Sequence, residues 1–224
     1  MADEVKKGVI VEFDFAVMNG AELLYRTTAA LLKESGVAFD ARVEARHLAG
    51  GNYQGGLAEY FAVAKTKKTP QKAAKDLADG FRKALEGEFP KAVTPAFRNF
   101  VKVLADRGLK VVIATRANLD VVRPAFGDIL GDAVVLYQEV AQTYGSVKWD
   151  AWRRALVMNK LRNTTTLAVT GSGYGVKSAL IAGMGAVAVT NDRVAYQDFG
   201  GADEVFKVLD SAAARAVLKI MRAG

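Results

Sequence analysis

Short apolar runs alternate with helical patterns along most of this chain. Five runs rich in β-branched residues have the length of buried strands, and they cover residues 8–13, 109–115, 133–137, 165–170 and 185–190. Apolar residues recur at helical spacing around the later runs, over 95–107, from 118, over 148–160, up to 184 and over about 202–222. This alternation is typical of an α/β fold with a doubly wound, mostly parallel, Rossmann-like sheet.

Residues 20–90 have a different pattern, which is helical throughout. Leucines recur at helical spacing over 21–36, and a glycine ends that pattern. A further helix is predicted over 70–85, where a threonine suited to N-capping precedes a proline suited to the first turn. We therefore predict an α/β core of residues 1–19 and 91–224, with residues 20–90 inserted as a helical cap over one edge of the sheet.

Composition narrows the class of protein. The 224 residues are 51% hydrophobic and 25% charged, and no apolar stretch approaches the roughly 20 residues that a membrane helix needs. We expect a cytoplasmic protein without membrane association, since the first residues contain no apolar signal region. The chain has no cysteine and a single histidine, His47. Disulfides, thiolate metal sites, a cysteine nucleophile and a multi-histidine metal site are therefore excluded.

The formal net charge of +7 suits an anionic partner. Lysines and arginines are spread along the chain, and the densest run, over 65–75, lies beside a predicted helix start. Such a run usually forms a solvated helix face. The chain has neither zinc-finger spacing nor an RNA-binding motif. We expect no nucleic-acid partner, whereas a small anionic ligand fits the charge.

Polar residues follow the predicted strands at their carboxyl ends. They are Glu12 with Asp14, Thr115, Gly171 with Ser172, and Asn191 with Asp192, and Lys148 opens the helix after the third run. Ligands of open α/β sheets bind at this edge, so these residues are expected to meet in one site. Taken alone, the acids could be solvated and Thr115 could cap the next helix, so the residues by themselves leave the role of this site open.

Several segments resemble the haloacid dehalogenase-like (HAD) superfamily, most closely the capped arm that includes β-phosphoglucomutase and phosphoglycolate phosphatase. The resemblance covers nearly the whole chain and rests on VIVEFDFAV, TPAFRNFVKVLADRGLKVVIATRAN, SVKWDAW, AVTGSGYGVKSALIAGM and RHLAGGNYQGGL. It implies a phosphatase or phosphomutase that acts on a small phosphorylated molecule with Mg²⁺.

The resemblance also implies a role for each matching residue. Glu12 stands at the position of the phosphoryl-accepting nucleophile, and Asp14 at that of the general acid/base. The phosphate-binding positions are Thr115, Arg116 and Lys148, and the magnesium positions are Glu12, Asp14 and Ser172. The substrate-facing positions of the cap are Arg46, His47, Gly50 and Asn52.

Three residues depart from the family pattern. Glu12 replaces an aspartate, Phe15 replaces a glycine, and Gly171 replaces the aspartate of the magnesium turn. A glutamate reaches one methylene further, and a misplacement of about 1 Å can cost on the order of 100-fold in rate. Mg²⁺ prefers carboxylate oxygens in tight octahedral geometry, and one acidic ligand is missing. We therefore expect an eroded phosphoryl-transfer site that is weakly active or inactive.

Three other interpretations stay open. Glu12 and Asp14 could still serve an active phosphatase of small metabolites. A non-catalytic protein could bind a protein partner, or a phosphorylated ligand through the N–H groups of the GSGYG turn. The same turn superficially matches a dinucleotide-binding unit with Asp192 as its acid, but Val176 replaces the third glycine of that motif.

Overall fold

The computed structural model describes residues 7–48, 53–64, 66, 68–139 and 148–223. Its centre is a six-stranded sheet in the order β3-β2-β1-β4-β5-β6, and every neighbouring pair is parallel. The strands are β1 (Gly8–Glu12), β2 (Lys110–Thr115), β3 (Val134–Gln138), β4 (Thr166–Thr170), β5 (Gly185–Val189) and β6 (Glu204–Phe206). The predicted doubly wound α/β fold is confirmed.

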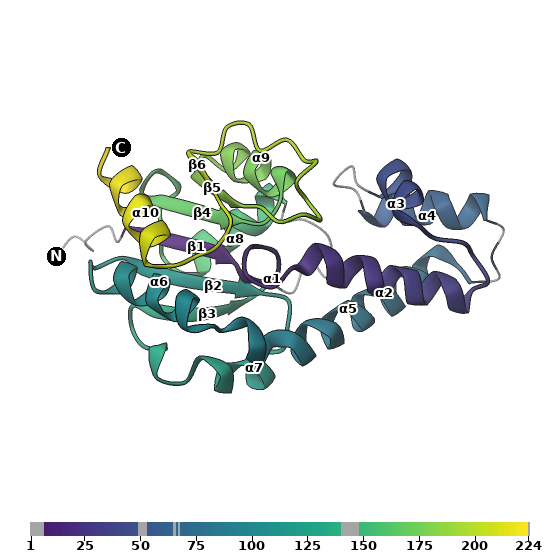
Figure 1. Ribbon diagram of the computed structural model, residues 1–224, viewed down its shortest axis with the longest axis horizontal. Coiled ribbons are helices and arrows are strands. Elements are labelled where there is room, and N and C mark those ends of the chain that lie inside the picture. The colour runs from purple at the N-terminus through teal and green to yellow at the C-terminus, as the bar shows by residue number, and fades with distance from the viewer. Residues whose placement is uncertain (1–6, 49–52, 65, 67, 140–147, 224) are drawn as a thin grey trace.

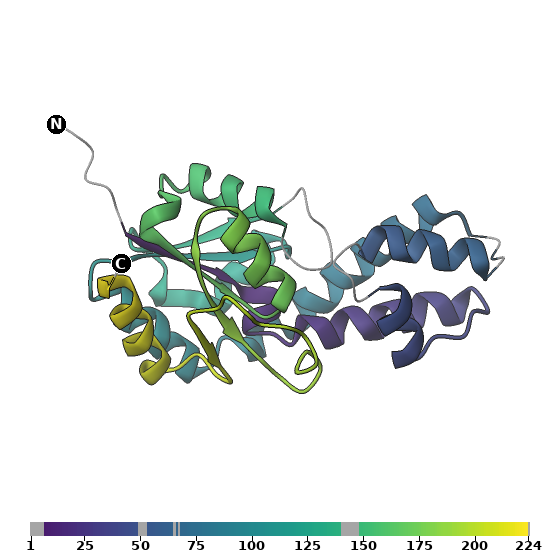
Figure 2. The same ribbon diagram turned by 90° about the horizontal axis from the view of Figure 1, so that it is seen from above.

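Helices cover both faces of this sheet (Figures 1 and 2). The helices packed on one face are α6 (Pro95–Ala105), α7 (Leu119–Phe126) and α10 (Ser211–Ala223), and those on the other are α8 (Trp149–Met158) and α9 (Gly173–Ile181). Successive strand residues point to opposite faces. Val9 and Val11 therefore join the first helical layer, whereas Ile10 joins the second. Burial on both faces explains why the strands are continuous apolar runs.

Four helices extend from the carboxyl-end edge of the sheet, away from the α/β layers (Figure 1). They are α2 (Gly20–Glu34), α3 (Ala41–His47), α4 (Tyr53–Val63) and α5 (Pro70–Ala92). An aromatic cluster joins them to the sheet, because Phe13 of the short helix α1 (Phe13–Ala16) stacks on Phe89 of α5 with ring centroids 4.5 Å apart. The division of the chain into core and cap domains stays a prediction.

Two predicted boundaries are wrong. The helix predicted over 70–85 continues to Ala92, because Phe81, Leu85 and Phe89 extend its buried stripe past the expected end. The helix predicted from about residue 202 begins at Ser211, and β6 precedes it. This three-residue edge strand is largely exposed, so it leaves no apolar run in the sequence. No helix in the described ranges is long and apolar enough to span a membrane.

Candidate functional site

Four of the predicted site residues meet at the carboxyl ends of β1 and β2. Glu12 is the last residue of β1, Asp14 lies in α1, Thr115 ends β2, and Arg116 follows it. All four are buried, and Asp14 is 0% exposed. Ionised groups are rarely buried so completely unless they are paired. The contacts among these four residues therefore decide what the site can do.

The Arg116 guanidinium lies between the two carboxylates. Its Nη1 donates to Asp14 Oδ2 at 2.9 Å, and its Nη2 donates to Glu12 Oε1 at 3.4 Å. The guanidinium carbon is also 5.2 Å from the centroid of the Phe15 ring. A cation carried by the chain itself thus bridges the acid pair, and the aromatic ring that departs from the family pattern packs against it.

Both oxygens of the Asp14 carboxylate accept hydrogen bonds from neighbouring groups. Thr115 Oγ1 donates to Asp14 Oδ1 at 2.6 Å, and the Arg116 backbone N–H donates to Oδ2 at 2.9 Å. Together with the guanidinium, these donors form the kind of arrangement that would hold a phosphate. Thr115 Oγ1 also accepts the Ala117 N–H at 3.1 Å, but the N-cap of α7 is Asn118. Thr115 and Arg116, two of the three residues expected to bind a phosphate, therefore donate to Asp14.

Glu12 is the second acid of this cluster. Thr170, the last residue of β4, donates its hydroxyl to Glu12 Oε2 at 2.5 Å. Burial raises the pKa of Glu12 to about 7, although Arg116 and the Thr170 hydroxyl oppose the rise. One guanidinium faces two carboxylates, so the fully ionised cluster carries an excess negative charge. Protonation of Glu12 removes that charge.

The residues present do not fit a bound Mg²⁺. Ser172, a predicted metal position, caps α9 by accepting the Gly175 N–H at 2.9 Å. A Cβ at Gly171 would lie 2.0 Å from the Phe15 carbonyl oxygen, so the backbone packing excludes a side chain at the position where the family has its aspartate. Within the described ranges, no three His, Cys, Asp or Glu side chains are grouped as metal ligands.

Two N–H groups of the GSGYG turn are engaged within the protein. Gln197 Oε1 accepts the Gly173 N–H at 2.9 Å, and Ser172 accepts that of Gly175. A Cβ at Gly173 would lie 2.1 Å from the Asp198 carbonyl oxygen. The segment that follows β5 therefore packs directly on the start of α9. These two N–H groups are therefore paired within the protein, and the anion-binding role of the turn stays a hypothesis.

Three further predicted residues lie at the ends of helices. Lys148 is exposed at the N-cap position of α8. Arg46 and His47 end α3, which lies beside α4 and away from the sheet (Figure 1). Gly50 and Asn52 lie outside the described residues. The substrate-facing roles of the four cap residues stay predictions.

A second charge cluster ties the helices to the segment after β5. Arg193 Nη2 donates to Glu44 of α3, and Arg193 Nε lies 3.7 Å from Glu22 Oε2 of α2. The guanidinium carbon is 3.9 Å from the ring centroid of Tyr25. Sequence reasoning missed Arg193, Gln197 and Thr170, and only Thr170 carries a signal there, as a hydroxyl at the end of a predicted strand.

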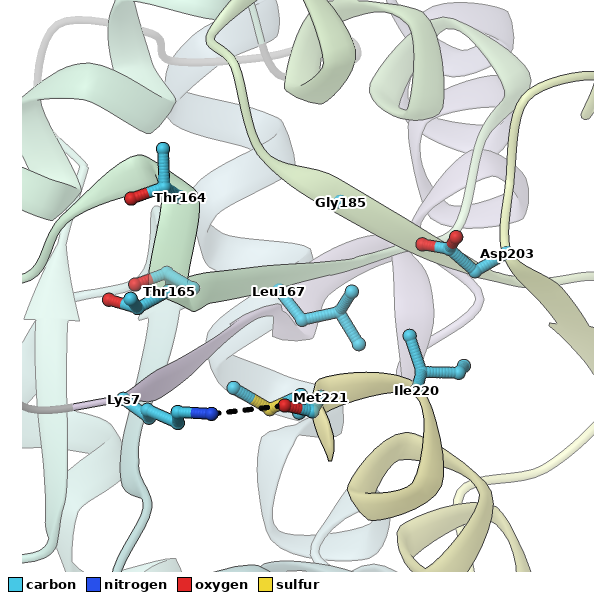
Figure 3. Close-up of a pocket in the computed structure, with 9 residues that line it drawn as sticks. Lys7, Thr164, Thr165, Leu167, Gly185, Asp203, Ile220 and Met221 are labelled. Carbon is cyan, nitrogen blue, oxygen red and sulfur yellow. Dashed lines mark hydrogen bonds between the residues drawn. The ribbon is translucent and has the colours of Figure 1, made fainter. Parts of the chain in front are cut away.

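Two cavities lie at opposite ends of the strands. The cavity beside Glu12 and Arg116 measures about 20 Å³, which is room for one water molecule. A cavity of about 530 Å³ lies at the opposite, amino-terminal end of β1 and β4 (Figure 3). Its Lys7 donates to the Met221 carbonyl at 3.2 Å and its Asp203 accepts the Ala186 N–H at 3.2 Å, so both charged groups have structural roles.

Known proteins resemble this chain in fold. No protein-family model and no curated sequence matches the chain. Among solved structures, CbbY from Rhodobacter sphaeroides in complex with phosphate has a TM-score of 0.65 at 18% identity, covering 92% of this chain and 95% of that one. A β-phosphoglucomutase from Clostridium difficile has a TM-score of 0.71 at 11% identity, covering 98% of each chain. A HAD family hydrolase from Deinococcus radiodurans with bound phosphate and sodium has 0.55 at 17%, also covering 98% of each.

Proposed function

We propose that this HAD-fold protein does not carry out metal-dependent phosphoryl transfer, and that it acts in the cytoplasm as a non-catalytic binding protein. The single observation that carries the proposal is the Arg116 guanidinium between Glu12 and Asp14. It supplies the positive charge that a divalent cation would otherwise bring to two adjacent carboxylates. The lack of cysteine agrees with a reducing compartment.

The contacts of the acids support this proposal. Phosphoryl transfer through a carboxylate requires an oxygen that can approach the phosphorus in line, with a metal to neutralise charge. Each carboxylate oxygen of Glu12 and Asp14 already accepts a hydrogen bond from Thr115, Arg116 or Thr170. A nucleophile held in this way would have to break a buried ion pair before it could react.

The contacts of Thr115 and Arg116, which were expected to bind phosphate, also support the proposal that the protein is non-catalytic. CbbY was solved with phosphate and, as a mutant, with xylulose-(1,5)-bisphosphate. In this chain, the Asp14 carboxylate takes the Thr115 hydroxyl and the Arg116 N–H. A phosphorylated molecule would have to displace an internal carboxylate to reach them. This observation favours a binding role elsewhere on the protein over one at the strand ends.

The test is a phosphatase assay with Mg²⁺ against a panel of sugar phosphates and an aryl phosphate. The wild-type protein and the Glu12→Gln variant are expected to release phosphate at the same background rate, and Mg²⁺ is expected to leave the melting temperature of both unchanged. Turnover that Glu12→Gln abolishes while the circular dichroism spectrum is retained would establish the alternative, an active phosphatase that uses Glu12 and Asp14.

Restoring the family's aspartate at Gly171 offers a second test. We expect Gly171→Asp, alone or with Glu12→Asp, to lower the melting temperature without restoring activity, because its Cβ would meet the Phe15 carbonyl. Gly87→Asp is a matched control, since a Cβ there has open space around it. If Gly171→Asp folded as well as Gly87→Asp and gained Mg²⁺-dependent turnover, the site would be repairable and our account of its packing wrong.

A further inference from the structure

A cavity of about 530 Å³ lies between the end of α6 and one face of α10, and its charge is mostly positive. We call it the basic cavity, and its lining residues are Val103, Asp106, Arg107, Arg215, Leu218, Lys219 and Arg222. Four of the seven are cations and one is an acid. Because Asp106 and Arg107 precede β2, this cavity lies at the amino-terminal end of the sheet, opposite the Glu12 cluster.

The cations of α10 form a stripe along one side of the helix. Arg215, Lys219 and Arg222 follow one another at spacings of four and three residues, so they share a face. Like charges at this spacing destabilise a helix. The helix dipole favours cations in the last turn, which accounts for Arg222, but it does not reach Arg215 near the start of α10. Helix stability therefore does not explain the whole stripe.

The four cations of the basic cavity are exposed side chains. None of Arg107, Arg215, Lys219 and Arg222 forms an ion pair with a carboxylate in the ranges that the structure describes. By contrast, Arg98 of the same α6 pairs with Asp128, and Arg193 pairs with Glu44. The floor of the cavity is partly apolar, with half-buried Val103 and Leu218. An anion entering the cavity would meet exposed guanidinium and ammonium groups above a partly apolar surface.

We infer that the basic cavity binds a small molecule carrying two or more phosphate charges. Three of its four cations are arginines, whose planar guanidinium groups match phosphate oxygens in pairs. Its volume lies within the range of small-molecule sites. This inference concerns a different site from the Glu12 cluster and does not depend on the proposed lack of catalysis.

The test is calorimetric titration of the full-length protein with pyrophosphate at low salt in the presence of EDTA. Arg215→Gln/Arg222→Gln is compared with Lys72→Gln/Lys75→Gln, which removes the same charge from exposed positions of α5. We expect the α10 pair to weaken binding by at least about tenfold, as loss of charge-assisted hydrogen bonds predicts, and the α5 pair by less than about twofold. Equal weakening by both pairs, or no binding to the wild type, would overturn the inference.

Two further ligands separate phosphate recognition from general attraction. Citrate carries comparable charge on carboxylates, and it is expected to bind at least about fivefold more weakly than pyrophosphate if the arginines recognise phosphate geometry. Equal affinity for citrate would contradict the phosphate assignment. An RNA oligonucleotide that bound more tightly than pyrophosphate, and lost affinity in the α10 variant, would instead make the cavity part of a nucleic-acid surface.

Discussion

Two clusters in this molecule each place one arginine between two carboxylates, and they differ in how much water reaches them. In the first, Arg116 pairs with Glu12 and Asp14, and the three side chains are 3%, 1% and 0% exposed. In the second, Arg193 pairs with Glu22 and Glu44, and the exposures are 23%, 27% and 15%. Both clusters pair a guanidinium with two carboxylates, and their exposure to water is the main difference between them.

Burial makes the charge interactions of the Arg116 cluster stronger than those of the Arg193 cluster. Charges interact more strongly where water is excluded, and the cost of leaving one unpaired grows in the same way. The Arg193 cluster is partly solvated, so water and salt screen it. The buried cluster therefore acts as a fixed part of the core, whereas the Arg193 cluster is a weaker tie between helices and sheet. Substituting Arg116 and Arg193 in turn should distinguish a cluster that stabilises the core from one that ties helices to the sheet more weakly.

Removing the buried arginine should have the largest effect. Arg116→Gln leaves Glu12 and Asp14 without their cation, and a broken buried ion pair costs roughly 3–5 kcal/mol. Urea unfolding at pH 8 measures the loss, which should shrink at pH 5 as Glu12 takes a proton. The triple variant Glu12→Gln/Asp14→Asn/Arg116→Gln, which buries no charge, should recover part of the stability. A loss below about 1 kcal/mol in the single variant would mean that the cluster is more solvated than its burial indicates.

Much of the fold follows from local pattern. The runs that became β1, β2, β4 and β5 are apolar because helices cover both of their faces, and a doubly wound sheet then brings their carboxyl ends together. This is why Glu12, Asp14 and Thr115 were expected to meet, and they do. β6 escaped prediction because an exposed three-residue edge strand needs no apolar run.

The function of the site was harder to derive, because it depends on side-chain pairing across the chain. Arg116 was expected to bind phosphate, yet its partners are carboxylates 102 and 104 residues away in sequence. The sequence at Gly171 predicts a lost ligand, whereas the packing of the Phe15 carbonyl against it shows that a side chain is excluded. Arg193 lies in an irregular segment, where hydrophobic periodicity carries no information about long-range ion pairs.

The pH dependence of stability should distinguish the two clusters next. The folded-state pKa of Glu12 is about 7 and its ordinary value 4.5, so the folded protein holds this proton more tightly than the unfolded chain. The folding stability that this tighter proton binding contributes is fully present below pH 4.5, and it is lost as the pH rises to about 7. It amounts to about 3 kcal/mol, since one pKa unit corresponds to about 1.4 kcal/mol.

Urea unfolding at pH 5 and pH 8 measures this loss against Glu12→Gln, which cannot titrate. The wild type should lose more stability over that range than the variant does. Glu22→Gln is the matched control from the solvated cluster, and it should retain the wild-type pH profile. Parallel pH profiles of unfolding free energy for the wild type and Glu12→Gln would show that Glu12 titrates near its ordinary pKa. The proposed electrostatic difference between the two clusters would then be wrong.

The smallest expected effect is that of Arg193→Ala. A partly exposed pair contributes roughly 0.5–1 kcal/mol, and 1 M NaCl should abolish the difference from wild type because the screening length falls to about 3 Å. The loss in Arg116→Gln should persist in the same salt. Amide hydrogen exchange should rise in α3, whose Glu44 is released. Arg26→Ala is the control, since Arg26 pairs with Glu22 within α2 alone. Unchanged exchange in α3 of Arg193→Ala would mean that apolar packing, and not Arg193, holds this helix in place.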